Sequence, residues 1–319
     1  MTSKERVLRA IEFRTPDRIP LAKGDDADMA VVTFDPPAGF TPAEAGMDEW
    51  GCVWNSFHTD LADQGQVVGH PLADWDRFAE YRFPDPDAPG RFDRMAGQLA
   101  RPVAEERFIV GHLGAGPMHR IDYLRGFEAY LTDLALQPER VEALLDGIFG
   151  VLAGLAQRYA DYPVDALLLN DDQAMQSGPL FSMDLWRRHF KPRYRGLFDR
   201  IHCQGMKVYM HTCGHLDRHL PLLADCGVDL LDNKQPSLWM DGPGTAAVRG
   251  RMAFSSSLDI QSTLFQIAPD EIASEVGRLI RRLSVPEGGF IGSFYHQPDL
   301  GIPPDRLARM VEAYRTFRW

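Results

Sequence analysis

The chain has few cysteines and no long apolar run. Its cysteines, at positions 52, 203, 213 and 226, form no CxxC pair and are too few for a disulfide framework in 319 residues. No stretch reaches the roughly 18 consecutive apolar residues that a membrane span needs, and the first residues lack the apolar core of a secretory signal. We therefore expect a reduced, cytoplasmic protein that does not enter a membrane.

Positive charge is also scarce. The 34 Lys and Arg residues are outnumbered by 45 Asp and Glu residues, which gives a formal net charge of −11. Nucleic-acid binding needs a basic surface, so nucleic acid is excluded as the main partner. No GxGxxG follows an early strand, which argues against a doubly wound dinucleotide-binding sheet.

The second half of the chain alternates short apolar segments with longer amphipathic ones. Strands are predicted at residues 164–169, 207–211, 228–231, 252–255 and 289–292, and helices at 184–202, 216–224, 267–283 and 304–317. Such alternation with short connections indicates a parallel sheet with helical crossovers. Its repetition over this length predicts an α/β protein with the architecture of a (β/α)8 TIM barrel.

The first half is less regular. A strand at residues 107–110 is followed by helices at 121–136 and 138–159, whereas residues 25–102 show no clear pattern. We expect that stretch to include insertions over the barrel mouth. Because no linker or low-complexity tract interrupts the chain, residues 1–319 are expected to form a single barrel domain.

Polar side chains follow most of the predicted strands. The functional residues of such barrels lie at the carboxyl ends of the strands, around one mouth. The side chains expected there are Asp171 and Asp172, His211 and Cys213, Asn233 and Gln235, Asp259 and Gln261, and His296. The two adjacent acids are expected to act as proton donors, metal ligands or substrate contacts. A helix cap or a solvated turn is the alternative for them.

The segment from Tyr209 to Cys213 predicts a metal site. Side chains alternate along a strand, so Tyr209, His211 and Cys213 share the face toward the barrel interior, while Val208 and Met210 face the helices. The Cα atoms of His211 and Cys213 would lie roughly 6–7 Å apart, which lets imidazole and thiolate reach one ion. Nitrogen and sulfur ligands favour zinc. A bare HxC pair is common, so a purely structural role is the alternative.

A zinc site needs a third ligand. A closed barrel gathers its strand ends around one mouth, so His296, just past the last predicted strand, is the expected one. His215 and His219 stand four residues apart and form a rival pair. We assign them to an exposed helix face, because the leucines at 216, 220 and 223 would form the buried one.

Seven short segments carry a family resemblance. They read SKERVLRA, TPDRIP, DEWG, LRGFE, HTCG, LDIQ and GGFI, at residues 3–10, 15–20, 48–51, 124–128, 211–214, 258–261 and 288–291. Together they resemble, in order and spacing, the uroporphyrinogen decarboxylase superfamily over nearly the whole chain. The resemblance implies a (β/α)8 barrel, in agreement with the strand–helix pattern.

That superfamily has a decarboxylase branch. Uroporphyrinogen decarboxylases hold the carboxylates of their substrate with an Arg-rich segment near the N-terminus. This chain has Asp25, Asp26 and Asp28 in that segment. Acidic side chains would repel a polycarboxylate, so we expect that the chain does not decarboxylate uroporphyrinogen.

The other branch contains corrinoid-dependent methyltransferases, such as aryl ether O-demethylases and coenzyme M methyltransferases. Residues 211–214 resemble their zinc-binding strand, which implies zinc on His211 and Cys213. In the coenzyme M type the third ligand is a cysteine, and here His296 stands in its place. Serines at 255–257 also replace the usual glycines, so the substrate is expected to differ from coenzyme M.

The resemblance implies methyl transfer between a small molecule, such as an aryl methyl ether, and a corrinoid. Residues 217–219 read DRH, but Leu222 replaces the glycine of a corrinoid-carrier motif, so a separate carrier protein is expected. Zinc would act as a Lewis acid or activate a thiol, with Asp171 or Asp172 as the catalytic acid. The side chains expected to orient the substrate are Tyr209, Asn233, Gln235, Asp259 and Gln261.

Two other functions stay open at this point. One is a decarboxylase of a small carboxylic acid or porphyrinogen-like substrate, which would need neither metal nor corrinoid. The other is a non-catalytic scaffold for zinc or for a corrinoid protein. The sequence also leaves open the methyl donor, the direction of transfer, which acid completes the zinc shell, and the oligomeric state, a homodimer included.

Overall fold

The fold is built on a curled parallel sheet. The computed structural model describes residues 1–55, 65–294 and 301–319. Within them the sheet has seven strands in the order β1-β4-β5-β8-β9-β10-β11, all paired in parallel. They are β1 (Met29–Thr33), β4 (Phe108–Ala115), β5 (Ala166–Asn170), β8 (Lys207–His211), β9 (Leu230–Asn233), β10 (Ala253–Ser256) and β11 (Phe290–Gly292).

Leu21 joins the two edges of this sheet. It forms a parallel bridge with Gly292 of β11, and its carbonyl oxygen accepts a hydrogen bond from the backbone N–H of Asp28, next to β1, at 2.8 Å. The strands therefore close into a ring with an eighth position at Leu21. The (β/α)8 barrel predicted from the sequence is confirmed.

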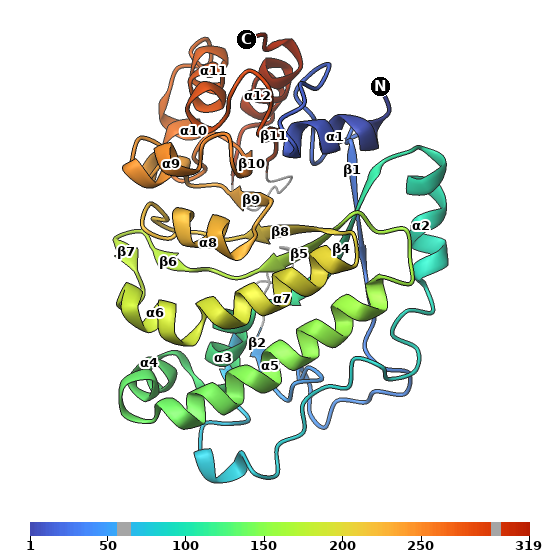
Figure 1. Ribbon diagram of the computed structural model, residues 1–319, viewed down its shortest axis with the longest axis vertical. Coiled ribbons are helices and arrows are strands. Elements are labelled where there is room, and N and C mark those ends of the chain that lie inside the picture. Colours follow the sequence, from blue (N-terminus) through green and yellow to red (C-terminus); the bar gives the residue numbers. More distant parts are fainter. Residues whose placement is uncertain (56–64, 295–300) are drawn as a thin grey trace.

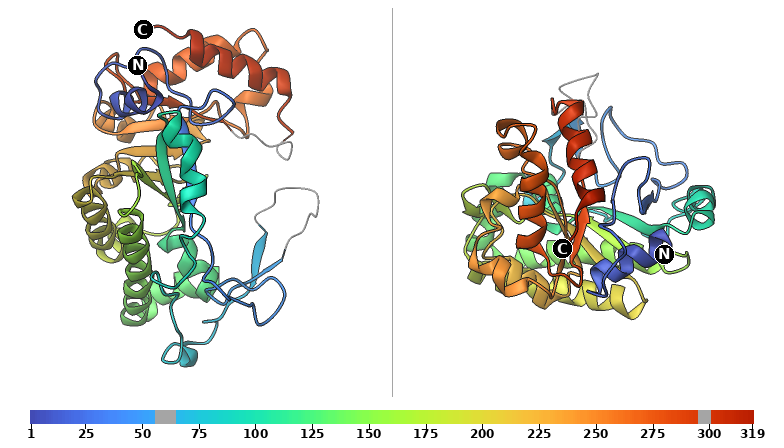
Figure 2. Two further views of the ribbon diagram at one scale, coloured as in Figure 1. Left: turned by 90° about the vertical axis from the view of Figure 1, so that its right-hand side faces the viewer. Right: turned by 90° about the horizontal axis from the view of Figure 1, so that it is seen from above.

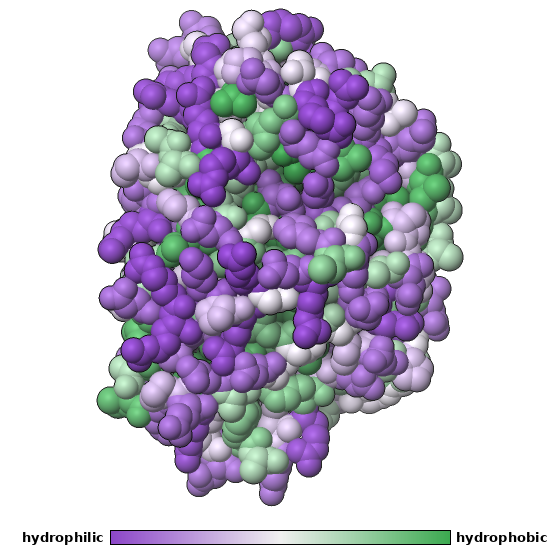
Figure 3. Space-filling view, in the orientation of Figure 1, coloured by the Kyte–Doolittle hydropathy of each residue, from purple (hydrophilic) through white to green (hydrophobic). Residues whose placement is uncertain are grey.

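Helices surround the strands, with α5 and α7 in the foreground of Figure 1. The helices are α1 (Ser3–Ile11), α2 (Met95–Ala104), α3 (Pro117–Arg125), α4 (Phe127–Leu136), α5 (Pro138–Tyr159), α6 (Met183–His189), α7 (Lys191–Cys203), α8 (Leu220–Cys226), α9 (Pro243–Val248), α10 (Thr263–Gln266), α11 (Ile272–Leu283) and α12 (Pro304–Thr316). Hydrophilic side chains cover most of the face shown in Figure 3. In the described part of the chain, no helix combines the length and apolar character of a membrane span.

Alternation along the strands divides the buried apolar residues into two groups. Outward side chains such as Val208 and Met210 belong to the large cluster between sheet and helices. Inward side chains such as Phe108, Tyr209 and Leu230 form a second cluster inside the barrel. Both follow from the period of two that places successive strand residues on opposite faces.

Helix α1 covers the amino-terminal end of the barrel. Val7, Ala10 and Ile11 belong to the inner cluster, and the Ala10 carbonyl accepts a hydrogen bond from the backbone N–H of Gly289, just before β11, at 2.8 Å. Figure 2 shows α1 lying beside α12 at this end, where both chain termini also lie. One end of the barrel is thereby filled by apolar side chains, and the other is left for polar ones.

Two short antiparallel strand pairs lie outside the barrel sheet in the described part of the chain. β2 (Val53–Asn55) and β3 (Gln66–Gly69) form an antiparallel pair, and α2 packs on β1 and β4. A second short antiparallel pair, β6 (Ala174–Met175) and β7 (Gly178–Pro179), follows β5. Figure 2 shows the β2–β3 pair projecting from the body of the molecule.

Several helix boundaries differ from the sequence-based prediction. The helix predicted at 121–136 is two helices, α3 and α4, which meet at Gly126 with a φ of 87°. The helix predicted at 184–202 is divided into α6 and α7, and Pro192 lies in the first turn of α7. Glycine with positive φ and proline both interrupt helical hydrogen bonding, which the amphipathic period alone did not reveal.

Candidate metal centre

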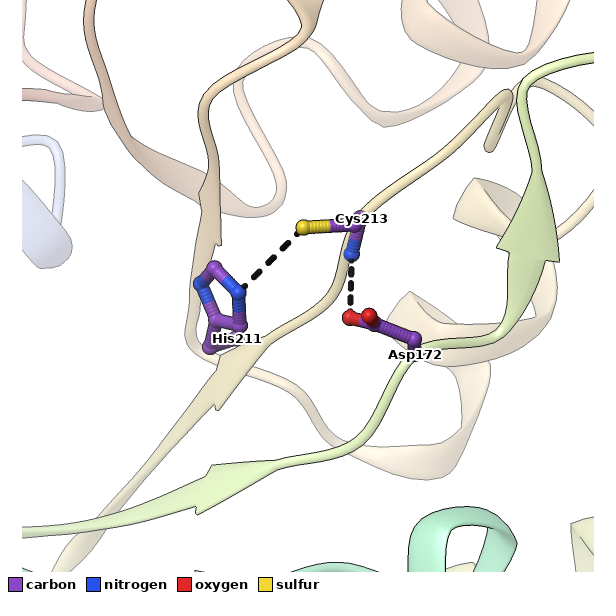
Figure 4. A group of neighbouring side chains, drawn as sticks. All are labelled: Asp172, His211 and Cys213. Carbon is purple, nitrogen blue, oxygen red and sulfur yellow. Dashed lines mark hydrogen bonds between the residues drawn. The ribbon is translucent and has the colours of Figure 1, made fainter. Parts of the chain in front are cut away.

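Three side chains that can ligate a metal meet at the carboxyl ends of β5 and β8. Among the residues described, Asp172, His211 and Cys213 form the one such group, with their ligand atoms all within 4.8 Å of one another. The Cys213 Sγ lies 3.5 Å from Nε2 of His211. Figure 4 shows both side chains turned toward each other, with the Asp172 carboxylate beside the Cys213 backbone. The predicted inward orientation of His211 and Cys213 therefore brings them together.

Asp232 holds the His211 ring from behind. Its Oδ2 lies 2.6 Å from His211 Nδ1, and a carboxylate oxygen accepts hydrogen bonds, so Nδ1 carries the proton in this pair. Nε2 is then the ring nitrogen that faces Cys213. Metal-binding histidines commonly have a carboxylate on the other nitrogen, which fixes ring and tautomer. His211 thus has the environment of a ligand.

Asp232 is itself embedded in the barrel interior. It accepts hydrogen bonds from Ser255 Oγ at 2.8 Å and from the Tyr209 hydroxyl at 3.4 Å, and Lys234 Nζ is ion-paired with it. Burial opposes its ionisation, but Lys234 and His211 outweigh that effect and hold the pKa of Asp232 well below its usual range. Lys234 and His211 thus favour the ionised form of the Asp232 carboxyl group.

Asp172 is held by two neighbours. Its Oδ1 accepts a hydrogen bond from the Cys213 backbone N–H at 2.7 Å, and its Oδ2 lies 3.5 Å from His119 Nε2. Burial disfavours its charge, but the hydrogen bond and charge of His119 leave the pKa of Asp172 lowered. His119 stacks on Tyr123 with ring centroids 5.7 Å apart, which fixes the imidazole beside the carboxylate.

The Cys213 thiol is buried beside two carboxylates. Burial, followed by the charges of Asp172 and Asp232, raises the pKa of Cys213 well above its usual range. A thiolate therefore needs additional positive charge close to its sulfur. A divalent cation supplies it, because coordination deprotonates a thiol.

Gly214 allows the chain to leave β8 at this point. Its φ is 87°, and a Cβ atom there would lie 2.1 Å from the carbonyl oxygen of Ala174. Only glycine accommodates both the left-handed backbone and that contact. The tight exit from the strand inferred from the sequence is present, and it places the Cys213 side chain in the barrel mouth.

Asp171 points away from this cluster. It is 0% exposed, and it accepts hydrogen bonds from the backbone N–H groups of Met118 and His119 at 2.9 and 3.0 Å and from the Tyr194 hydroxyl. These amides belong to the first turn of α3, where a carboxylate satisfies unpaired donors. Burial raises the pKa of Asp171 to about 6 despite these donors.

Asn233 and Gln235 brace the backbone around Cys213. Asn233 donates from Nδ2 to the Thr212 carbonyl at 2.7 Å, and Gln235 Oε1 accepts from the Gly214 N–H at 2.7 Å. Tyr209 lies one inward position below His211 and donates to Ser255 Oγ at 3.0 Å. In this structure all three side chains contact the protein around His211 and Cys213, and contact of any of them with substrate stays a prediction.

The remaining predicted residues lie farther along the chain. Asp259 accepts from the backbone N–H groups of Gln261 and Ser262 at 2.9 and 3.1 Å, and Gln261 Oε1 accepts from Gln176 at 2.5 Å. Their roles toward substrate are likewise not tested by these contacts. His296, the predicted third ligand, lies outside the described residues.

The rival histidine pair is not on an exposed helix face. α8 begins at Leu220, so His215 and His219 precede it. His219 is 1% exposed and packs edge-on against Trp186, and its Nδ1 has no hydrogen-bond partner among the described residues. Burial lowers the pKa of His219 to about 4. A buried neutral imidazole replaces the solvated pair that the sequence suggested.

Sequence reasoning missed three side chains of the site: His119, Asp232 and Lys234. The strand prediction ended at residue 231, whereas β9 continues to Asn233. Continuing the alternation from Leu230 would have placed Asp232 and Lys234 on the inward face. His119 lies on α3 and reaches Asp172 only through tertiary packing, so no local pattern signals it.

Zinc fits the residues present. Zinc is bound by thiolate, imidazole and carboxylate, and catalytic zinc sites have three protein ligands and an open fourth position. Asp172, His211 and Cys213 supply one group of each kind. The carboxylate behind His211 and the thiol buried beside two carboxylates add to the fit.

Comparison with known proteins places this barrel in a family. The family model described as uroporphyrinogen decarboxylase (URO-D) matches residues 59–317. The chain belongs to the URO-D family. The resemblance inferred from seven short segments is thereby confirmed at the level of the family. No curated protein matches the chain in sequence.

Solved structures resemble the URO-D chain in fold. A methyltransferase from Methanosarcina mazei has a TM-score of 0.71 at 17% sequence identity, with 98% of each chain covered. A family 10 endo-β-1,4-xylanase from Gloeophyllum trabeum has a TM-score of 0.43 at 12% identity, covering 73% of this chain and 83% of the xylanase. At 17% identity the likeness to the methyltransferase concerns the fold alone.

Proposed function

We propose that this URO-D family protein is a zinc-dependent methyltransferase that moves a methyl group between a small molecule, such as an aryl methyl ether, and a corrinoid on a separate protein. The observation that carries the proposal is the Asp172–His211–Cys213 cluster, backed by Asp232, at the carboxyl end of the barrel. The full-length likeness in fold to a methyltransferase supports the same branch of the family.

Asp172, His211 and Cys213 would hold the zinc ion, with His296 as a further candidate ligand. When bound, zinc supplies Lewis-acid stabilisation of negative charge on the oxygen or sulfur that gives up or receives the methyl group. Asp232 keeps the His211 proton on Nδ1, so that Nε2 faces the cluster. Gly214 and the hydrogen bond from the Cys213 N–H to Asp172 fix the thiol's position.

His119 is the group best placed to hold a proton beside this cluster. Its Nε2 lies 3.5 Å from Asp172 Oδ2, and although burial opposes the charged ring, the hydrogen bond to Asp172 and the nearby carboxylates leave the pKa of His119 raised. A methyl ether leaves behind an alkoxide or phenolate that must be protonated. In our proposal His119 Nε2 holds that proton, rather than the enclosed Asp171.

The corrinoid would reach the cluster from the carboxyl end of the barrel. α1 fills the opposite end with apolar side chains. The corrinoid-carrier motif is incomplete at Leu222, which is why the proposal gives the corrinoid to another protein. The partner's docking surface would surround the strand ends that hold Asp172 and Cys213.

The first experiment is the metal content of the purified protein. We expect about one zinc per chain in the wild type, loss of the metal and of methyl transfer in Cys213→Ala, and no change in Cys203→Ala, whose cysteine is exposed and outside the cluster. Full methyl transfer by Cys213→Ala would falsify the proposal. A metal-free wild type that decarboxylates a small acid would support the decarboxylase instead.

A second comparison identifies the third ligand. Asp172→Asn and His296→Gln each remove one candidate, and zinc affinity is measured by competition with a chelator. We expect the larger loss in Asp172→Asn, because its carboxylate already lies within 4.8 Å of the other two ligand atoms. A larger loss in His296→Gln would instead give the third position to the histidine predicted from the sequence.

A further inference from the structure

A row of inward-facing positions continues from the metal cluster around the barrel mouth. The sheet register pairs Asn170 with His211, His211 with Asp232, Asp232 with Ser255, and Ser255 with Ile291. Two residues farther along the chain, just past the carboxyl end of each strand, continued alternation gives the next row. That row consists of Asp172, Cys213, Lys234, Ser257 and Ser293.

Two hydroxyls in this row are buried without a partner. Ser257 is 0% exposed and Ser293 is 1% exposed, and among the described residues neither Oγ has a hydrogen-bond partner. The backbone N–H of Ser293 donates to the Ser256 carbonyl at 2.9 Å, so the parallel ladder continues to this level and sets the two serines side by side. Two unpaired hydroxyls on neighbouring strands are costly unless an acceptor joins them.

Lys234 stands next to Ser257 in the row. It is 1% exposed, and its hydrogen-bond partner in the described chain is Asp232. An ammonium group has three N–H donors, so two remain for other acceptors. Lys23 adds a second positive charge close enough to contribute to the electrostatics of Lys234, whose pKa is lowered chiefly by burial. In a chain with a net charge of −11, this is a local concentration of donors and positive charge.

We propose that Lys234, Ser257 and Ser293 form a subsite for an oxyanion, a carboxylate or a sulfonate, carried by the small-molecule substrate. That the anion belongs to a methyl donor or acceptor rests on the proposed function, whereas binding of the anion does not. Oxyanions accept several hydrogen bonds from ammonium and hydroxyl donors, and such bonds are about twice as strong as neutral ones.

The row also sets the size of the substrate. Cys213 is one strand away from Lys234 and two strands away from Ser257, and neighbouring strands lie about 4.8 Å apart. An oxyanion held between Lys234 and Ser257 is therefore roughly 5–10 Å from the metal cluster. A molecule with its methylated atom at one end and its acid group at the other, separated by a single ring, spans that distance.

The test measures anion binding without any methyl transfer. Calorimetry with the purified metalloprotein would use benzoate and methanesulfonate as probes and neutral benzamide as control. We expect both anions, but not benzamide, to bind the wild type and Ser274→Ala, whose serine lies exposed on α11. Binding should weaken roughly tenfold in Ser257→Ala or Ser293→Ala and be lost in Lys234→Met, because each change removes a donor to a charged acceptor.

A second prediction concerns the melting temperature of the two serine variants in the absence of any anion. Removing a hydroxyl that has no partner breaks no hydrogen bond, so without anion the melting temperature of Ser257→Ala and Ser293→Ala should equal or exceed that of the wild type. The anion-induced rise in melting temperature should shrink in both. A lowered melting temperature in the unliganded variants would mean that the hydroxyls have structural partners, and it would overturn the subsite.

Cys213→Ala separates this subsite from the metal. If the anions still bind when the metal is lost, they bind at Lys234, even where the zinc proposal has failed. If anion binding disappears in Cys213→Ala and stays unchanged in the serine variants, the anion binds the metal, and the proposed subsite is wrong. A wild type that binds no anion at all also contradicts the subsite, whatever its zinc content.

Discussion

Asp171 and Asp172 are neighbours in the chain but belong to two different polar regions. Asp172 faces the barrel mouth, where Cys213 and His211 offer ligand atoms with room for an ion between them. Asp171 faces the layer between sheet and helices, where α3 amides, Tyr194 and Gln173 surround it. The donors around Asp171 in this outer region all belong to the protein, so polarity there serves the fold. In the inner region Asp172, His211 and Cys213 lie close to Lys234 and to two hydroxyls that have no partner among the described residues, so polar groups there are available to a ligand.

The largest expected effect is on the free energy of unfolding and should come from replacing Asp171. Asp171→Asn places an amide N–H₂ among donors, so we expect the unfolding free energy of metal-free protein to fall by about 3 kcal/mol. The same change at Asp172 should cost less than about 1 kcal/mol and should lower zinc affinity instead. Urea unfolding in the presence of a chelator measures the first quantity. Equal destabilisation by the two variants would remove the distinction between the regions.

The next effect concerns the carboxylate behind the metal ligand. Asp232→Asn should weaken zinc binding by roughly 10- to 100-fold, because carboxylates behind ligating histidines raise their basicity and fix their orientation. The chain offers a matched control, since Asp229 makes a similar contact with His202 at 2.7 Å near the other end of the same strands. Chelator competition should find unchanged affinity in Asp229→Asn. Similar losses in both variants would point to a general structural effect.

The smallest of the three expected effects is the pH dependence of stability caused by His219, which lies in the outer region. The pKa of His219 is about 4 in the folded chain and about 6.5 when unfolded. Its contribution to stability is therefore complete above about pH 6.5 and is lost as the pH falls toward 4, because the unfolded chain gains the proton first. At about pH 5 the loss is about 2 kcal/mol.

Substituting His219 with leucine should remove that part of the pH dependence. We expect His219→Leu to be at least as stable as the wild type at about pH 7, because its Nδ1 has no partner in the described chain, and to lose about 2 kcal/mol less between about pH 7 and pH 5. Denaturation at both pH values gives the comparison. An unchanged pH dependence would show that the buried imidazole is not titrating as described.

Local periodicity predicted much of the barrel and the core of the candidate site. The alternation around His211 and Cys213 is a property of one strand, so it could be read without knowing the fold. The ring of strands followed from repeated strand–helix alternation. The alternation along β5 places Asp171 on the face opposite to Asp172, but its partners could not be predicted, because they depend on the approach of α3, where a Cβ at Gly116 would lie 2.3 Å from the Asp171 side chain.

Sequence reasoning missed or misplaced other residues for a different reason. The contacts of Lys234 and Asp232 are with residues on β8 and β10. These strands are brought beside β9 only by the register of the sheet. His219 was misplaced because the helix was started four residues too early, at Leu216 rather than Leu220. Alternation along β9 gives the face of Asp232 and Lys234, but their partners on the neighbouring strands are long-range and cannot be predicted from one segment.

Helix α1, which fills the amino-terminal end of the barrel, has a consequence for the order in which the substrate and the carrier protein bind. Val7, Ala10 and Ile11 pack among the inner strand residues, so in the described part of the chain the amino-terminal end is filled and a molecule would reach the cluster from the carboxyl end. A carrier protein docked on that end would seal it. In our proposal the small molecule must therefore bind before the carrier protein and leave after it. The kinetic mechanism is then compulsory-ordered. Excess carrier protein would inhibit turnover, because it would trap the demethylated product in the site.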